Sequence, residues 1–202
     1  MFVLVRHGNT FEAGTSPRRI GARTDLPLTA AGIGQARALG THFAHRGMVF
    51  AQALVSPLLR TRQTAAEILA QQALPPDPTD AQFLREIDHG PDENQTEDAV
   101  RKRLGAEALL AWDTCGQPPA DWIVDPEARI AAWRALFAAP PAKGPILLVT
   151  SNGAARFALL ADLGLREQAA LHATLKLPTG GYGVIARRAD SALHLACWGE
   201  RP

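Results

Sequence analysis

Apolar residues along the chain occur as short continuous runs separated by longer segments with helical spacing. Residues 2–5, 50–55 and 146–150 form short, largely apolar runs, which is the pattern of strands buried on both faces. Residues 180–186 and 192–198 predict two closing strands joined by an Arg-Arg-Ala-Asp turn. The chain has no internal repeat that would indicate a solenoid.

The segments between these runs carry start and stop signals of helices. Thr29 precedes apolar residues at helical spacing, and Gly47 supplies the stop. Ser56 and Pro57 have the pattern of an N-cap followed by proline at the first helical position, which predicts a helix to about residue 71. Further helices are predicted at 96–113, at 126–138 and after Asn152-Gly153.

Strands that alternate with helices predict an α/β fold, a three-layer α/β/α sandwich around a mostly parallel sheet. A length of 202 residues favours a single domain over residues 1–202. Segment 90–145 contains two of the predicted helices and is interpreted as a helical cap or insertion over the site.

Composition narrows the class of protein. No basic, apolar leader and no run long enough to span a membrane is visible, so a cytoplasmic protein without a membrane partner is expected. Cys115 and Cys197 lie far apart and form no Cys-x-x-Cys pair, which argues against a disulfide framework and a structural zinc site.

Charge is unevenly distributed although the net charge is only +1. Residues 1–62 hold eight arginines against Glu12 and Asp25, a balance of +6 that leaves −5 for the remainder. This asymmetry favours a small anionic ligand near the N-terminal half. No basic cluster is interleaved with aromatic residues, so nucleic acid is not expected as a partner.

Three polar clusters follow predicted strands: Arg6-His7-Gly8, residues 56–60 and Ser151-Asn152-Gly153. In open α/β sheets, ligands bind beyond the carboxyl ends of the strands, so neighbouring strands would bring these clusters together. The predicted helix start at Ser56 would add free backbone N–H groups. Together the clusters predict an oxyanion site.

The residues of these clusters suit phosphoryl transfer. An imidazole beside two guanidinium groups should stay neutral near pH 7, so His7 is placed to attack phosphorus rather than clamp phosphate. Arg6 and Arg60 can supply positive charge to the equatorial oxygens. Arg62 points about 200° away from Arg60 around the same helix and is interpreted as a surface residue.

Glu86 is the candidate proton donor for the departing alkoxide. Nearby Asp88, Asp92 and Glu93 are expected to raise its pKa, and Glu93 is the candidate substitute. The alternative for Glu86 is a solvated acidic face.

In order and spacing, these motifs resemble the histidine phosphatase superfamily, also called phosphoglycerate mutase-like. The resemblance covers the first 65 residues and extends through 84–90 and 146–156. It implies that His7 is the phosphorylated nucleophile, that Arg6 and Arg60 bind phosphate, and that Glu86 donates the proton, without a metal or organic cofactor. The motifs that carry it are Arg6-His7-Gly8-Asn9-Thr10, then Leu28-Thr29 with Gly32 and Gln35-Ala36, then Ser56-Pro57-Leu58-Leu59-Arg60-Thr61-Arg62-Gln63-Thr64-Ala65.

The sequence departs from the family pattern at three positions. Ser151 stands where relatives usually carry a second histidine, and Ala13 where many carry an asparagine that touches phosphate. Replacing a charge-assisted hydrogen bond of roughly 1.5 to 3 kcal/mol by a neutral hydroxyl is expected to slow the chemical step by about ten- to a hundredfold. His89 stands where relatives often have an aromatic residue, and either restores a charged donor or is a structural residue.

The leading interpretation is a phosphomonoesterase that forms a phosphohistidine on His7 and is slowed by Ser151. Its ligand would be a small phosphorylated substrate or inorganic phosphate. The alternatives are a non-catalytic protein that binds a phosphate ester or nucleotide, and a phosphomutase. The remaining candidate site residues are Asn9 and Ser151 for phosphate binding, with His89, Glu93 and Asn152 as auxiliary residues.

Overall fold

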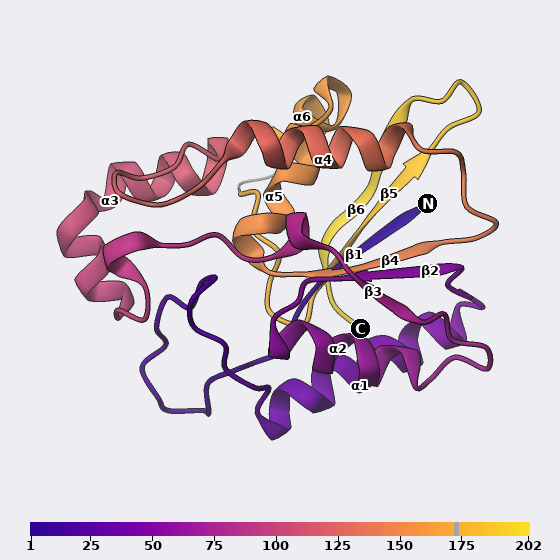
Figure 1. Cartoon of the computed structure of the whole chain (residues 1–202), viewed down its shortest axis with the longest axis horizontal. Helices are drawn as coiled ribbons and strands as arrows, with labels where there is room; N and C mark the ends of the chain where they lie inside the picture. Colours follow the sequence, from indigo (N-terminus) through magenta and orange to yellow (C-terminus); the bar gives the residue numbers. More distant parts are fainter. Residues whose placement is uncertain (172–173) are drawn as a thin grey trace.

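A single mixed sheet of six strands, in the order β3-β2-β4-β1-β5-β6, organises the fold (Figure 1). The computed structural model describes residues 1–171 and 174–202. β1, β2, β3 and β4 pair in parallel, β5 pairs antiparallel with β1, and β6 pairs antiparallel with β5. The prediction of a mostly parallel sheet is therefore confirmed. The strands are β1 Phe2–Arg6, β2 Gln52–Val55, β3 Pro78–Asp80, β4 Ile146–Thr150, β5 Tyr182–Arg187 and β6 Leu193–Glu200.

Helices cover both faces of the sheet and complete the predicted three layers. In Figure 1, α1 and α2 lie below the sheet, α4, α5 and α6 lie above it, and α3 extends beyond one side. The helices are α1 Ala30–His45, α2 Leu59–Leu69, α3 Glu97–Cys115, α4 Pro126–Ala138, α5 Asn152–Leu160 and α6 Leu163–Ala169, with the short 3-10 helices η1 Gln82–Leu84 and η2 Gly90–Asp92.

The alternation of side chains along β1 divides the core into two apolar clusters. Val3 and Val5 pack with α1 and α2, whereas Phe2 and Leu4 pack on the opposite face. There, Phe2 meets Phe137 of α4 at a ring distance of 5.1 Å. Each such fully buried side chain stabilises the fold by roughly 1.5 to 3 kcal/mol, which holds the carboxyl end of β1 in place.

The register of the two central strands positions the site. β1 and β4 are parallel neighbours, with Arg6 opposite Thr150, and the backbone N–H of His7 donates to the carbonyl of Thr150 (3.1 Å). His7 and Ser151 consequently leave the same edge of the sheet at the same level.

The second helix begins later than predicted, so the assignment of Ser56 as its N-cap is wrong. Leu58 is the N-cap and has no side-chain capping bond. The carboxylate of Asp25, which is distant in sequence, accepts from the N–H of Leu59 (2.7 Å). Because this tertiary contact occupies the start of α2, the expected free N–H groups at Ser56 do not form an anion site.

Segment 90–145, expected as a cap, divides between two roles. α3 begins at the N-cap Thr96, bends at Gly105, and borders the cavity described below. α4 instead packs on the sheet, with Trp133 and Phe137 in the core. Trp112 and Trp122 are also buried in that cluster, and Trp112 additionally borders the cavity.

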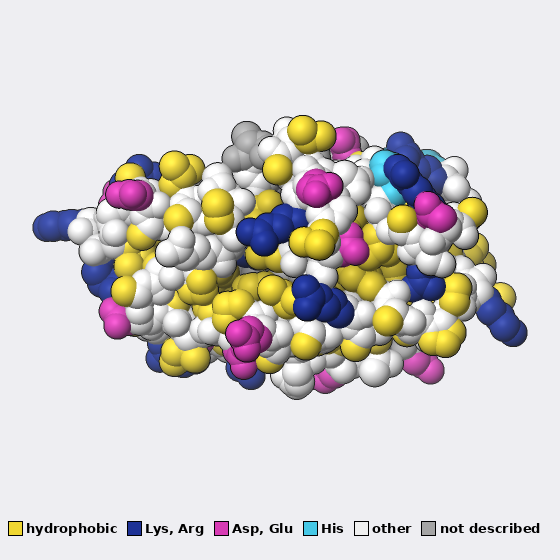
Figure 2. Space-filling view, turned by 90° about the horizontal axis from the view of Figure 1, so that it is seen from above, with side chains coloured by type: hydrophobic (Ala, Val, Ile, Leu, Met, Phe, Trp, Pro, Cys, Tyr) yellow, Lys and Arg dark blue, Asp and Glu magenta, His cyan; other side chains and the backbone are white. Residues whose placement is uncertain are grey.

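The surface formed by α3, α4 and α6 is mixed in character. Figure 2 shows hydrophobic side chains interspersed with Lys, Arg, Asp and Glu over this face. Within the described residues, no helix combines the length and apolar character needed to cross a membrane.

Candidate active site

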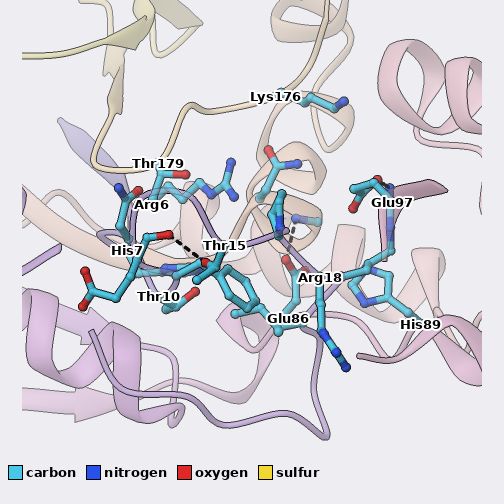
Figure 3. A pocket seen from close by; sticks show the side chains of 18 of the residues that line it. Arg6, His7, Thr10, Thr15, Arg18, Glu86, His89, Glu97, Lys176 and Thr179 are labelled. Carbon is cyan, nitrogen blue, oxygen red and sulfur yellow. Dashed lines mark hydrogen bonds and ion pairs between the residues drawn. The ribbon is translucent and has the colours of Figure 1, made fainter. Parts of the chain in front are cut away.

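A cavity of about 740 Å³ opens beyond the carboxyl ends of β1 and β4. Arg6 and His7 come from the end of β1, Glu86 from the segment after η1, and Asn152 and Gly153 from the start of α5. Much of the remaining wall comes from the loop between β1 and α1. In Figure 3, His7 lies toward one end of the cavity, Glu97 and His89 lie toward the other, and Glu86 lies between them.

His7 is held as a neutral base. Its side chain is buried, and Nδ1 lies 2.8 Å from the carbonyl of Gly8, an acceptor that assigns the proton to Nδ1. Nε2 then carries a lone pair, which accepts from Nε–H of Arg60 (3.2 Å). Burial, followed by the charges of Arg60 and Arg6, lowers the pKa of His7 well below 6.5 despite the Gly8 contact. The imidazole can therefore act as a nucleophile through Nε2.

Arg60 lies beneath His7 rather than on the cavity wall. It is completely buried, and its terminal nitrogens donate to the carbonyls of Thr24 (2.8 Å) and Gly21 (3.2 Å). The predicted difference between the two arginines of α2 is confirmed for burial, because Arg62 is exposed and pairs with Asp80.

Arg6 lines the cavity and keeps one donor available. One terminal nitrogen donates to the carbonyl of Leu177 (2.8 Å), while Nε has no partner among the described residues. Burial lowers the pKa of Arg6 to about 10, so the guanidinium stays charged at neutral pH. This side chain can donate to an oxyanion in the cavity.

Glu86 is fixed by two backbone donors. Its carboxylate accepts from Ile87 N (2.9 Å) and from Gly153 N at the start of α5 (3.0 Å). A Cβ at Gly153 would lie 2.3 Å from Oε1, so only glycine permits this contact. Burial raises the pKa of Glu86, but the charge of His89, these N–H groups and Arg60 outweigh it and leave the pKa below 4.5.

The expectation that neighbouring acids raise the pKa of Glu86 is therefore wrong. Asp88 pairs with Arg23 (2.9 Å), and Asp92 pairs with Arg103 and accepts from the indole N–H of Trp122 (2.7 Å). Cations that are distant in sequence neutralise both carboxylates. What remains next to Glu86 is positive charge.

Glu93 supports the site from outside the cavity lining. One oxygen accepts from Gly21 N (2.8 Å), Arg23 N (3.2 Å) and the hydroxyl of Thr24 (2.7 Å), and the other accepts from His89 N (3.2 Å). Burial alone would raise the pKa of Glu93, but the side chain of His89, the Thr24 hydroxyl and the N–H groups of Gly21 and His89 lower it to about 2. This placement favours a structural role over the expected role as substitute acid.

His89 does line the cavity. Nδ1 lies 3.5 Å from Oε2 of Glu93 without forming a hydrogen bond, and the ring packs edge-on against Trp122 with centroids 4.6 Å apart. A Cβ at Gly21 would lie 2.3 Å from Glu93 and 2.6 Å from His89, so this glycine lets the 21–24 loop contact the pair. The same loop supplies the carbonyls that hold Arg60.

The remaining candidates occupy different positions. Ser151 is completely buried outside the cavity lining, and its Oγ has no partner among the described residues. Asn9 and Asn152 line the cavity, and the side-chain oxygen of Asn152 accepts from Leu177 N (3.0 Å).

Sequence reasoning missed the outer wall of the cavity. Arg18 and Arg19 come from the β1–α1 loop, Asp113 from the end of α3, and Lys176 from the segment before β5. These residues occur in separate segments without a shared motif, so the sequence carried no signal for them. Across residues 1–171 and 174–202 no cluster of three metal-binding side chains occurs.

A family model described as histidine phosphatase superfamily (branch 1) matches residues 2–196. The 2,3-bisphosphoglycerate-dependent phosphoglycerate mutase of Afipia carboxidovorans is 30% identical over 202 residues, covering 96% of this chain and 94% of that protein. Matches to the enzymes of the same name from Beijerinckia indica (32% identical) and a Methylobacterium strain (35%) each cover 55% of this chain and only about half of the relatives, 54% and 53%.

Solved structures show the same fold at lower identity. A mycobacterial glucosyl-3-phosphoglycerate phosphatase superposes with a TM-score of 0.77 at 21% identity, covering 100% of this chain and 99% of that one. The phosphoserine phosphatase of Entamoeba histolytica, solved with 3-phosphoglyceric acid, gives a TM-score of 0.72 at 20% identity, with 98% and 96% covered.

Proposed function

The chain belongs to the histidine phosphatase superfamily, and we propose that it hydrolyses phosphate monoesters through a phosphohistidine on His7. The observation that carries this proposal is the protonation and hydrogen bonding of the His7 imidazole. Its Nδ1–H is engaged by Gly8, and its Nε2 lone pair meets only the Nε–H of Arg60. A buried neutral imidazole whose Nε2 lone pair is released when this one hydrogen bond opens is an activated phosphoryl acceptor.

In the first step, Nε2 of His7 attacks phosphorus, and the bond from phosphorus to the ester oxygen breaks. Nε2 can no longer accept a hydrogen bond once it is bonded to phosphorus. The Nε–H of Arg60 is then free to donate to a phosphoryl oxygen, beside the unpartnered Nε–H of Arg6. In the second step, water attacks phosphorus, and phosphate leaves with the regeneration of neutral His7.

Glu86 moves the proton in both steps. The lowered pKa makes it a carboxylate in the free protein, so we infer that the proton arrives with the phosphate ester, whose second pKa is about 6. The protonated Glu86 donates to the leaving alkoxide and then, as carboxylate, accepts a proton from the attacking water. His89, the other histidine on the described cavity wall, is proposed as an auxiliary hydrogen-bond donor to the ligand.

The main alternative is a phosphate-ester or nucleotide binding protein without turnover. The buried Oγ of Ser151, which lacks a partner, is the observation that favours it, because this position offers a hydroxyl where a charged donor is usual in the family. A mutase is the third possibility, and dependence of the reaction on a phosphorylated primer would identify it.

The experiment that tests the proposal is acid quenching after mixing with ³²P-labelled phenyl phosphate, together with a measurement of phosphate release. We expect label on the protein, release of phosphate, and neither result for the variant His7→Ala. Tight binding of phosphate without label or release would establish the binding protein instead.

A further inference from the structure

The outer part of the cavity is charged on every side but close to electrically neutral. Beyond Arg6 and Glu86, the described lining holds three cations and three carboxylates. Two of the cations are already paired with carboxylates, whereas Arg18 and Glu12, both from the β1–α1 loop, have no ion-pair partner within the described residues. The residues are Arg18, Arg19 and Lys176, and Glu12, Glu97 and Asp113.

The first ion pair joins the β1–α1 loop to the start of α3. Nη2 of Arg19 lies 2.5 Å from the carboxylate of Glu97, and the guanidinium packs over the ring of Trp122 at 5.0 Å. Backbone hydrogen bonds of Arg19 to Gln95 (2.8 Å) and from Asn94 (2.8 Å) fix this loop. The cation is therefore positioned by the protein and compensated before a ligand enters.

The second ion pair joins the other end of α3 to the segment before β5. Nζ of Lys176 lies 2.6 Å from the carboxylate of Asp113, whose own carbonyl accepts from Leu175 N (2.9 Å). An acid near a helix C-terminus faces the negative end of the helix dipole, so Asp113 has a second reason to retain its cation. Hence α3 supplies one carboxylate to Arg19 and one to Lys176.

A ligand with a second anionic group would find no surplus positive charge in this region. At Arg19 or Lys176 its carboxylate would have to displace Glu97 or Asp113 from a short ion pair, and the loop that presents Arg18 also presents the carboxylate of Glu12. Hydroxyl groups can instead accept from the cations and donate to the carboxylates together. We propose that the outer cavity selects phosphate monoesters whose remaining part is uncharged and hydroxylated, and discriminates against phosphorylated acids. This specificity rests on the proposed function, because it concerns the same site.

Two phosphate esters of similar size that differ in one group provide the test of this specificity. 3-Phosphoglycerate and glycerol 3-phosphate, taken with the same configuration at the central carbon, differ only by a carboxylate in place of a hydroxymethyl group. We expect kcat/KM to favour glycerol 3-phosphate by about fivefold or more, the size of a partly exposed charge interaction. In parallel, calorimetry on His7→Ala measures the affinity for each ester without turnover.

Two variants of the second ion pair should move this preference in opposite directions. Asp113→Asn leaves Lys176 uncompensated and should shift the preference by about fivefold toward 3-phosphoglycerate. Lys176→Gln removes the nearer cation of Asp113 and leaves only Arg156 at 4.0 Å, so the preference should shift the other way. Asp125→Asn makes the same charge change at the N-cap of α4, outside the cavity lining, and should leave the preference unchanged.

The outcomes separate the two proposals. A preference for 3-phosphoglycerate in the affinity measurement, or a preference that neither variant moves, overturns the specificity. Absence of turnover and of labelled His7, with tighter binding of glycerol 3-phosphate to His7→Ala, overturns only the proposed hydrolysis.

Discussion

The ends of β1 and β4 lie side by side in the same register, yet they carry different chemistry. His7 follows β1 with every polar atom of its ring engaged, by Gly8 on one nitrogen and Arg60 on the other. Ser151 follows β4 with a buried hydroxyl that has no partner among the described residues. The end of β1 presents an imidazole with both nitrogens hydrogen-bonded, whereas the end of β4 presents a hydroxyl without a hydrogen-bond partner among the described residues.

This difference separates attack on phosphorus from stabilisation of the charge that develops there. The β1 side contains the proposed nucleophile, which burial and then the charges of Arg60 and Arg6 keep neutral. The β4 side contributes Gly153, which orients Glu86, but no cation of its own at Ser151. For the proposed reaction, the site thus holds candidates for attack and proton transfer but lacks a charged donor at Ser151. The following predictions test these two sides separately.

The largest effect is expected for Glu86→Gln, which breaks the proton transfer while keeping acceptors for Gly153 and Ile87. Hydrolysis of alkyl phosphates should fall by about a hundredfold to ten-thousandfold, because a basic alkoxide needs a proton in the transition state. Aryl phosphates with a good leaving group should be affected much less. Steady-state kinetics with both substrate types gives the ratio, and an equal loss for both would assign Glu86 to structure or binding.

Arg60→Ala removes one of the two cations next to His7. Affinity for phosphate should fall by about ten- to a hundredfold, the size of a charge-assisted hydrogen bond, and the pKa of His7 should rise because a repelling charge is lost. Phosphate titration measures the affinity, and an NMR titration of the imidazole measures the pKa. Arg62→Ala, on the exposed side of the same helix, is the matched control and should change neither quantity. Unchanged affinity in Arg60→Ala would exclude a role in phosphate binding.

Ser151→His would place a charge-capable donor at the end of β4. If the missing charged donor limits the reaction, phosphorylation of His7 should accelerate by about ten- to a hundredfold. Rapid-quench measurements with labelled substrate report this step directly, and the same substitution in a His7→Ala background should give no label. A folded Ser151→His protein that still leaves His7 unlabelled would favour the binding-protein alternative.

The smallest effect is expected for Glu93→Gln. Glu93 holds the 21–24 loop, and the carbonyls of that loop hold Arg60. Loss of charge-assisted hydrogen bonds to the 21–24 loop should lower the free energy of unfolding by about 2 kcal/mol near neutral pH. Because folding lowers the pKa of Glu93 from 4.5 to about 2, the wild-type advantage is present above pH 4.5 and disappears as pH falls toward 2. Denaturant unfolding across this range measures it, and a pH-independent difference would refute the charge-based explanation.

Local signals in the sequence were sufficient for most of the fold. Thr29 caps α1 by accepting from Gly32 N (3.1 Å), and Asp125 and Pro126 begin α4, because capping depends on residues a few positions apart. Where a distant group intervenes, these signals failed: Asp25 occupies the start of α2, and the short strand β3 was missed because its three exposed residues have no apolar pattern.

For the candidate site, the sequence by itself determined which residues meet at the strand ends, since strand–loop order along the chain brings His7, Arg60 and Ser151 to one edge. Only the tertiary structure decided their electrostatics. Burial raises the pKa of Glu86, but the charge of His89, the N–H groups of Gly153 and Ile87 and the charge of Arg60 lower it below 4.5. Asp88 and Asp92, which were expected to raise it, pair instead with Arg23 and Arg103. The charge of the outer cavity is likewise set by pairs that are distant in sequence, Arg19 with Glu97 and Lys176 with Asp113. Charge interactions depend on separation in space and on burial, and neither can be read from positions along a chain.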